Sequence, residues 1–213
     1  MLDAFGHVSI RHPSDADRFV ISRSLSPAQV TASDLQLFDL AGARVAGDER
    51  PAYAEAAIHA GIYRRRPDVK AVVHSHADPL IPFTVTGIAL RPITHIGAVM
   101  GHTAPVWDSA KEFGDLMLVT SAPQGDALAK ALGKDTVVLM RGHGCAVAAT
   151  TVHVTVMIAI RLVQNAKHLA SALALGPVTY LSAAEIERSR ALILAPLSMD
   201  RAWGYWVSRL PAR

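Results

Sequence analysis

Residues 69–76 read Val-Lys-Ala-Val-Val-His-Ser-His, an apolar run that ends in two histidines one residue apart. The β-branched residues predict a strand over residues 69–75. Because side chains two positions apart share one face of a strand, extending it by one residue places His74 and His76 side by side. Two adjacent imidazoles are a usual start of a transition-metal site. In a chain with 10 histidines, such a pair also arises by chance.

A further histidine stands between two glycines in Arg141-Gly142-His143-Gly144-Cys145. This segment follows an apolar run that predicts a strand over residues 136–140. The flanking glycines let the backbone turn sharply and bring the ring close to a bulky group. Alone, the segment is compatible with a plain turn. Together with His74 and His76, it is better explained by a three-histidine metal site with open positions, as in catalytic centres.

A candidate acid/base residue, Glu55, lies near the start of a predicted helix over residues 51–66, which Pro67 follows. Its neighbours in the sequence are alanines. A carboxylate near a metal and apolar walls can have its pKa raised enough for proton transfer. The alternative is an acid that only complements the helix dipole.

The remaining pattern alternates strands with helices, which predicts an α/β layered fold and one domain over residues 1–213. Further strands are expected at Arg18–Ser22 and Leu35–Asp39. Further helices are expected over residues 121–132 and 151–175, and another is expected to begin at Ser182.

Composition excludes several classes of protein. The 213 residues are 51% hydrophobic and 18% charged, which excludes a disordered chain. The single cysteine, Cys145, forms no internal disulfide, so we expect a cytoplasmic protein. We interpret it as a buried thiol, with a soft metal ligand as the alternative. The apolar residues 145–160 are too few to span a membrane. The net charge is only +3 and the lysines and arginines are scattered along the sequence, so we expect no nucleic-acid partner.

The motifs together resemble the class II aldolase/adducin family. They are Gly6 followed by His7-Val8-Ser9-Ile10-Arg11, then Glu55, His74-Ser75-His76 and Gly142-His143-Gly144. The resemblance implies a three-layer α/β/α domain around a central, largely antiparallel sheet. It also implies a homotetramer with sites at subunit contacts and one divalent metal ion (Zn, Mn or Fe) per subunit. By position, His74, His76 and His143 are the metal ligands, and Glu55 is the catalytic acid/base.

The chain departs from the sugar-phosphate members of that family. Those members usually carry Asn where this chain has His7, a small Gly/Ser-rich turn where it has residues 22–27, and a Ser pair where it has Tyr53-Ala54. The usual phosphate cradle is therefore largely missing, which disfavours a phosphorylated sugar. Family members also begin with a helix before the Gly turn. We expect that helix to be missing here, with a chain start assigned too late as the alternative.

Other segments resemble the branch of decarboxylases that act on hydroxylated aromatic dicarboxylates. These segments are Pro82-Phe83, residues 91–95 and residues 202–206. Arg23 has the planar donor geometry that binds a carboxylate. The predicted substrate-binding residues are Arg23, Ser24, His7, His95 and Trp203. For Trp203 and Trp206, anchoring a helix to the core is an equal alternative.

We therefore expect a metal-dependent carbon–carbon lyase that releases CO2 from a hydroxylated aromatic mono- or dicarboxylate. In this reaction the metal stabilises negative charge on oxygen and Arg23 holds a second carboxylate. Either Glu55 or a metal-bound water protonates the ring carbon. The first alternative is a retro-aldolase or epimerase that forms a metal-stabilised enediolate from a non-phosphorylated hydroxy-carbonyl compound. An iron oxygenase and a non-catalytic scaffold are further alternatives, and the intact histidine set argues against the scaffold.

Overall fold

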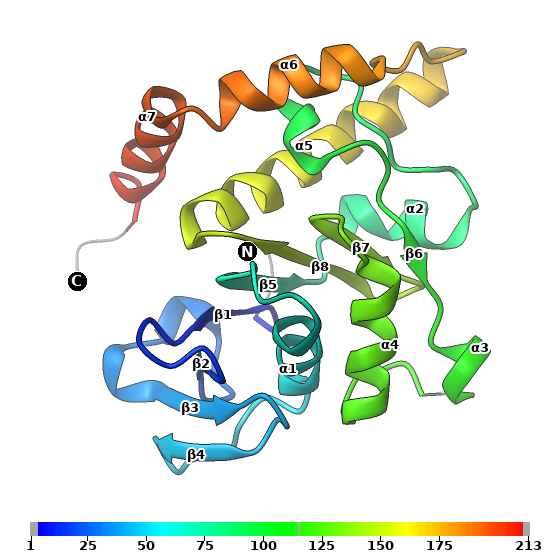
Figure 1. Ribbon diagram of the computed structural model, residues 1–213. Helices are drawn as coiled ribbons and strands as arrows, with labels where there is room; N and C mark the ends of the chain where they lie inside the picture. The colour runs from blue at the N-terminus through cyan, green and yellow to red at the C-terminus, as the bar shows by residue number, and fades with distance from the viewer. Residues whose placement is uncertain (1–3, 115, 211–213) are drawn as a thin grey trace.

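In the part of the chain that the structure describes, eight strands form one sheet in the order β4-β3-β2-β1-β5-β8-β7-β6. The computed structural model describes residues 4–114 and 116–210 (Figure 1). Neighbouring strands are antiparallel, except that β6 and β7 are parallel. The strands are β1 His7–Arg11, β2 Arg18–Ser22, β3 Leu35–Asp39, β4 Arg44–Gly47, β5 Ala71–Ser75, β6 Val106–Trp107, β7 Val137–Met140 and β8 Gly144–Ala149.

Helices cover both faces of this sheet. The α-helices are α1 Ala56–Arg65, α2 Ile81–Val85, α3 Ala110–Phe113, α4 Ala122–Leu132, α5 Val152–Leu175, α6 Ala183–Ile193 and α7 Pro196–Val207. The connections contain the 3-10 helices η1 Pro27–Gln29, η2 Ala32–Asp34, η3 Asp78–Leu80 and η4 Ile96–Met100. In Figure 1, α1 and α4 lie on one side of the sheet and α5 lies on the other, with α6 and α7 beyond it. The predicted three-layer α/β fold with a largely antiparallel sheet is confirmed.

The alternation of side chains along β5 assigns each residue to one layer. Val72 packs with the core between the sheet and α1/α4, whereas Val73 packs with the core between the sheet and α5. His74 shares the face of Val72, because strand residues two apart point the same way. The imidazole of His74 therefore faces the α1 side, where it is fully buried.

The structure confirms most predicted elements and shifts some bounds. Strands β2 and β3 have the predicted limits. Helix α1 begins at Ala56, later than predicted, because Ala52 forms an isolated β-bridge with Arg23. Sequence analysis missed β1, β4, β6, β8, α2, α3 and α7. The apolar residues 145–160 are divided between β8 and α5, since the Thr151 hydroxyl accepts a hydrogen bond from the Val154 N–H and begins the helix.

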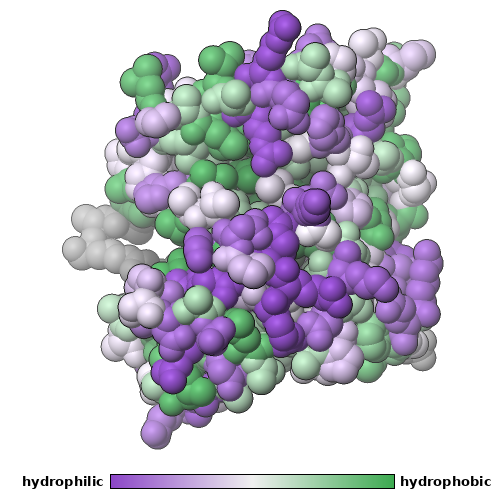
Figure 2. Space-filling model, viewed as in Figure 1, coloured by the Kyte–Doolittle hydropathy of each residue, from purple (hydrophilic) through white to green (hydrophobic). Residues whose placement is uncertain are grey.

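Hydrophilic residues occupy the middle of the molecular face in Figure 2, and hydrophobic residues lie in patches around them. Within the described residues, no helix is long and apolar enough to cross a membrane. The helix that we expect to be missing would precede the turn at Gly6. Residues 1–3 lie outside the described part of the chain, so this expectation stays a prediction.

Helices α1 and α4 touch through glycine. A Cβ placed on Gly61 of α1 would overlap the backbone of Gly125 on α4, and a Cβ on Gly125 would overlap the Ala57 carbonyl. These two positions therefore set how closely the helices approach each other. Since Glu55 directly precedes α1, the same contact helps to locate the candidate site.

We predict that Gly61→Ala destabilises the protein by about 1–3 kcal/mol, because the new methyl group displaces backbone rather than a flexible side chain. Gly204→Ala in α7 is the matched control, because a Cβ there meets no atom within 4 Å. In that open helical position, alanine should stabilise by about 0.5–1 kcal/mol. Urea unfolding of both variants measures the difference, and equal stabilities would contradict this account of the helix contact.

Candidate active site

Three histidines and one glutamate converge at one end of β5. His74 comes from the strand and His76 from the residues after it, while His143 comes from the β7–β8 turn and Glu55 precedes α1. The potential ligand atoms of these four residues all lie within 4.8 Å of one another. His76 Nε2 is 3.0 Å from His74 Nε2 and 3.1 Å from His143 Nε2. Glu55 Oε2 is 3.5 Å from both His74 Nε2 and His143 Nε2.

Backbone carbonyls set the orientation of two of these imidazoles. His74 Nδ1 donates to the Cys145 carbonyl at 3.0 Å, and His143 Nδ1 donates to the Met117 carbonyl at 3.1 Å. Because a carbonyl only accepts, the hydrogen is on Nδ1 in both rings and the Nε2 lone pair points to the cluster. Burial lowers the pKa of His74 well below its usual value, which keeps the ring in the neutral, metal-binding form.

This donor set fits a divalent transition metal. Three imidazole nitrogens and a carboxylate oxygen are typical ligands of such ions, and a second hydrogen bond on the far ring nitrogen is the usual support for a ligating histidine. Gly142 shapes the turn that carries His143, because its φ of +63° is in the left-handed region. Cys145 is a buried free thiol with its pKa raised by burial to about 11, and it is not in the cluster.

Glu55 is held as an anion. Its Oε1 accepts a hydrogen bond of 2.9 Å from the Val119 N–H. Burial raises the pKa of this carboxyl, but interactions with His143, His74 and the Val119 N–H together lower it below its usual value. The pKa rise expected from the sequence is therefore wrong. That expectation considered the apolar surroundings but not the donors that stabilise the charged form.

A cavity of about 450 Å³ opens beside the cluster. Its lining combines site residues with apolar side chains: Phe5, His7, Ser24, Tyr53, Ala54, Glu55, His76, Leu118 and His143. Two of the predicted substrate-binding residues, His7 and Ser24, are thus brought to the metal cluster. The other three, Arg23, His95 and Trp203, are not among the residues that line this cavity.

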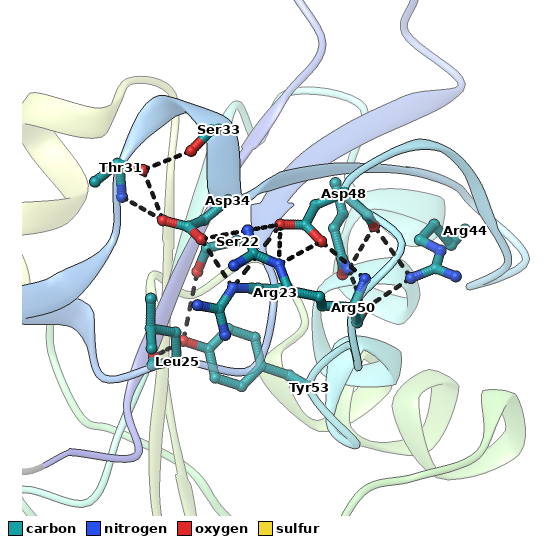
Figure 3. Close-up of polar contacts among 11 residues, drawn as sticks. Ser22, Arg23, Leu25, Thr31, Ser33, Asp34, Arg44, Asp48, Arg50 and Tyr53 are labelled. Atoms are coloured by element: carbon teal, nitrogen blue, oxygen red, sulfur yellow. Dashed lines mark hydrogen bonds and ion pairs between the residues drawn. The ribbon is translucent and has the colours of Figure 1, made fainter.

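Arg23, which precedes Ser24 of the cavity lining, belongs to an ion-pair cluster (Figure 3). Its Nε lies 2.8 Å from Asp34 Oδ1 and 3.8 Å from Asp48 Oδ2. Arg50 pairs with both carboxylates as well. Hydrogen bonds from Thr31 and Arg23 hold the pKa of Asp34 well below its usual range. The structure therefore pairs Arg23 with carboxylates of the chain itself.

His95 and Trp203 lie near α5 rather than near the cluster. His95 lines a second cavity together with residues of α5 and α7. Trp203 stacks edge-on against His153, with ring centroids 4.1 Å apart. Within one chain, the structure does not bring either residue to the metal cluster.

Sequence analysis missed a buried polar chain that begins at the cavity. His7 Nδ1 is 2.7 Å from His59 Nε2, His59 Nδ1 is 2.5 Å from Ser9 Oγ, and Ser9 Oγ is 2.9 Å from the Tyr63 hydroxyl. His59 is fully buried, and burial lowers its pKa to about 3. A signal was present: His59 lies one helical turn after Glu55, and Ser9 lies two strand positions after His7.

The profile of the "Class II Aldolase and Adducin N-terminal domain" matches residues 2–169. The chain belongs to the class II aldolase/adducin family. Within this family it is 34% identical over 236 residues to "Decarboxylase tropJ" of Talaromyces stipitatus, covering 97% of this chain and 86% of that protein. It is 30% identical to a "3,4-dihydroxyphthalate decarboxylase" of Arthrobacter keyseri, covering 73% of this chain and 64% of that protein.

Solved structures of class II aldolase-fold proteins share the architecture. An L-fuculose 1-phosphate aldolase superposes with a TM-score of 0.76 at 20% identity, covering 89% of this chain and 86% of that chain. An aldolase II superfamily protein from Pseudomonas syringae superposes with a TM-score of 0.79 at 21% identity, covering 97% and 83%. The relatives indicate an enzyme, and the lyase class fits them.

We predict that the protein binds about one divalent transition-metal ion per chain, as expected for a single three-histidine site. His143→Ala and His76→Ala should each lose most of that metal, because each removes a ligand. His168→Ala, at an exposed position of α5, is the control and should retain it. Elemental analysis after gel filtration measures the content. Full metal content in His143→Ala would show that the ion binds elsewhere.

We predict that acid destabilises the fold through His59. Its pKa is about 3 in the folded state and near 6.5 when unfolded, so the unfolded state binds the proton first. The contribution of His59 is therefore complete above pH 6.5 and decreases as the pH falls towards 3, by up to about 1.4 kcal/mol per pH unit.

Urea unfolding between pH 4.5 and 7 tests this prediction. A metal chelator is present throughout, so that pH-dependent release of metal does not contribute to the measured stability. The free energy of unfolding of His59→Gln should depend less steeply on pH than that of the wild type, whereas His168→Gln should keep the wild-type slope. Equal slopes for all three proteins would rule out His59 as the source.

Proposed function

We propose that the chain is a divalent-metal-dependent decarboxylase of hydroxylated aromatic mono- or dicarboxylic acids. The observation that carries the proposal is the Glu55/His74/His76/His143 cluster at the end of a cavity with largely apolar walls. The relatives from Talaromyces stipitatus and Arthrobacter keyseri, both named as decarboxylases, support the same reaction type. The homotetramer with sites at subunit contacts and the cytoplasmic location stay predictions.

The cavity walls favour an aromatic substrate over a sugar phosphate. Phe5, Tyr53, Ala54 and Leu118 supply apolar surface. Within the described residues, neither lysine nor arginine lines this cavity, so a phosphate would lack a cationic partner there. His7 and Ser24 offer polar groups that can orient the substrate by hydrogen bonding. Arg23 as the ligand of a second carboxylate stays a prediction, and binding there requires it to share or leave Asp34.

The residues of the cluster divide the chemistry between them. His74, His76 and His143 would hold the metal ion, which when bound supplies Lewis-acid stabilisation of negative charge on substrate oxygens. Glu55 begins as a carboxylate, so it can accept the proton of a ring hydroxyl. The bond between the ring carbon and the carboxylate carbon then breaks. The electron pair of this bond stays with the ring, and CO2 leaves. Glu55 then returns the proton to the ring carbon, and the phenolate takes a proton from water.

The test is CO2 release from a panel of ortho-hydroxybenzoates and hydroxyphthalates by metal-loaded protein. We expect release that requires both metal and His143, and a decrease in kcat of about 10²-fold or more in Glu55→Gln, which keeps the shape but not the proton transfer. Glu187→Gln, at the exposed pair with His102, is the matched control and should keep full activity.

The outcomes separate the proposal from its alternative. No CO2 across the panel from protein with bound metal would overturn the decarboxylase proposal. Cleavage of a non-phosphorylated aldol compound by the same protein would instead support the retro-aldolase. Undiminished CO2 release by Glu55→Gln would remove Glu55 from the mechanism.

A further inference from the structure

A second cavity of about 450 Å³ lies on the opposite face of the sheet from the metal cluster. It is formed where the residues around η4 meet α5, α6 and α7. Met157, which lines it, packs in the same core as Val73, on the α5 side. His74 points to the α1 side, because it shares the face of Val72. The sheet therefore separates this cavity from the metal cluster within one chain.

Apart from Tyr205, the ionisable side chains that line this cavity are all basic. Arg161 of α5, Arg201 of α7 and His95 line it, and within the described residues its lining includes neither aspartate nor glutamate. Neither arginine forms an ion pair within 4.0 Å in residues 4–114 and 116–210, whereas Arg64 and Arg141 pair with Asp126 and Asp108. Two guanidinium groups thus face one cavity without a carboxylate from the chain to balance them.

Arg161 is held in place despite that missing partner. One of its terminal nitrogens donates to Gln164 Oε1 at 2.8 Å, and its Cζ lies 5.7 Å from the centre of the Trp206 ring. Its Nε is buried and has no hydrogen-bond partner. An arginine oriented by an amide and an aromatic ring loses little side-chain entropy on binding an anion.

Apart from Ser198, the rest of the lining is apolar or aromatic. Ile96 and Ile193 supply aliphatic surface, and the half-exposed Tyr205 lies at the cavity as well. A small inorganic anion would use the charges but leave this surface in water. A planar organic acid would use both, because its ring covers the aliphatic side chains while its carboxylate meets the guanidinium groups.

We propose that this cavity is a binding site for an aromatic carboxylate, separate from the metal cluster and independent of the proposed function. Arg161 and Arg201 bind the carboxylate, and Ile96 and Ile193 contact the ring. His95, predicted from the sequence to bind substrate, hydrogen-bonds the ligand here instead. The proposal also accounts for Trp206, because this ring orients Arg161.

The experiment titrates the metal-loaded protein and its His143→Ala variant with phthalate, benzoate and inorganic phosphate. Calorimetry measures the affinity, and tryptophan fluorescence reports on Trp206. We expect phthalate to bind both proteins with a Kd on the order of 1 mM, as befits so small a ligand. Arg201→Gln and Arg161→Gln should each weaken binding roughly tenfold, because each removes a charge-assisted hydrogen bond.

Arg209→Gln is the matched control, since Arg209 lies on the same end of the chain, stacks on Tyr205 and does not line the cavity. It should bind phthalate like the wild type. Arg201 is exposed, so its substitution should leave the fold intact even where that of Arg161 does not. Loss of phthalate binding in His143→Ala would place the ligand at the metal cluster and overturn the proposal. Wild-type affinity in Arg201→Gln, or phosphate binding as tightly as phthalate, would overturn it as well.

Discussion

The antiparallel pairing of β5 with β8 is the interaction on which the candidate site depends. It places Ser75 opposite Cys145 and His74 opposite Ala146, so the turn carrying His143 lies at the end of the strand carrying His74. The Cys145 carbonyl then accepts the hydrogen of His74 Nδ1 and leaves Nε2 for the cluster. One register of strand pairing thus brings together ligands about 70 residues apart in the sequence. A slip by one residue would turn His74 to the opposite face.

The glutamate and the buried histidine depend on a second constraint, the close approach of α1 to its neighbours. Gly61 meets Gly125 on one side of α1, and His59 joins Ser9 of β1 by a hydrogen bond. Because Glu55 directly precedes the helix, these contacts also limit where its carboxylate can lie. Hydrogen bonds connect His7, which lines the cavity, through buried residues to Tyr63 in the core. This side of the cavity is therefore continuous with the core.

The sequence predicted the parts of the site that are encoded in short patterns. The spacing of His74 and His76 and the glycines around His143 were sufficient to predict a cluster of three histidines. Strand geometry and turn geometry are set by a few neighbouring residues, so a short stretch of sequence reveals them. The role of Arg23 was not predictable in this way. Its partner Asp34 comes from a different segment, and nothing local shows that the guanidinium already has a carboxylate. Strand β1 was missed because His7, Ser9 and Arg11 interrupt its apolar pattern, and each of them has a buried partner that only the fold supplies.

The segment that includes Met117, Leu118 and Val119 orients two groups of the cluster through its main chain. The Met117 carbonyl orients His143 and the Val119 N–H binds Glu55, while the side chains of Met117 and Leu118 are 40% and 52% exposed. The two jobs of this segment are therefore separable: the backbone maintains the reactive groups, and the side chains face whatever enters. Substitutions at position 118 can alter the shape of the entrance without touching the groups that perform the reaction. Substrate preference can therefore change during evolution through side-chain substitutions in this segment, while the reaction type is retained.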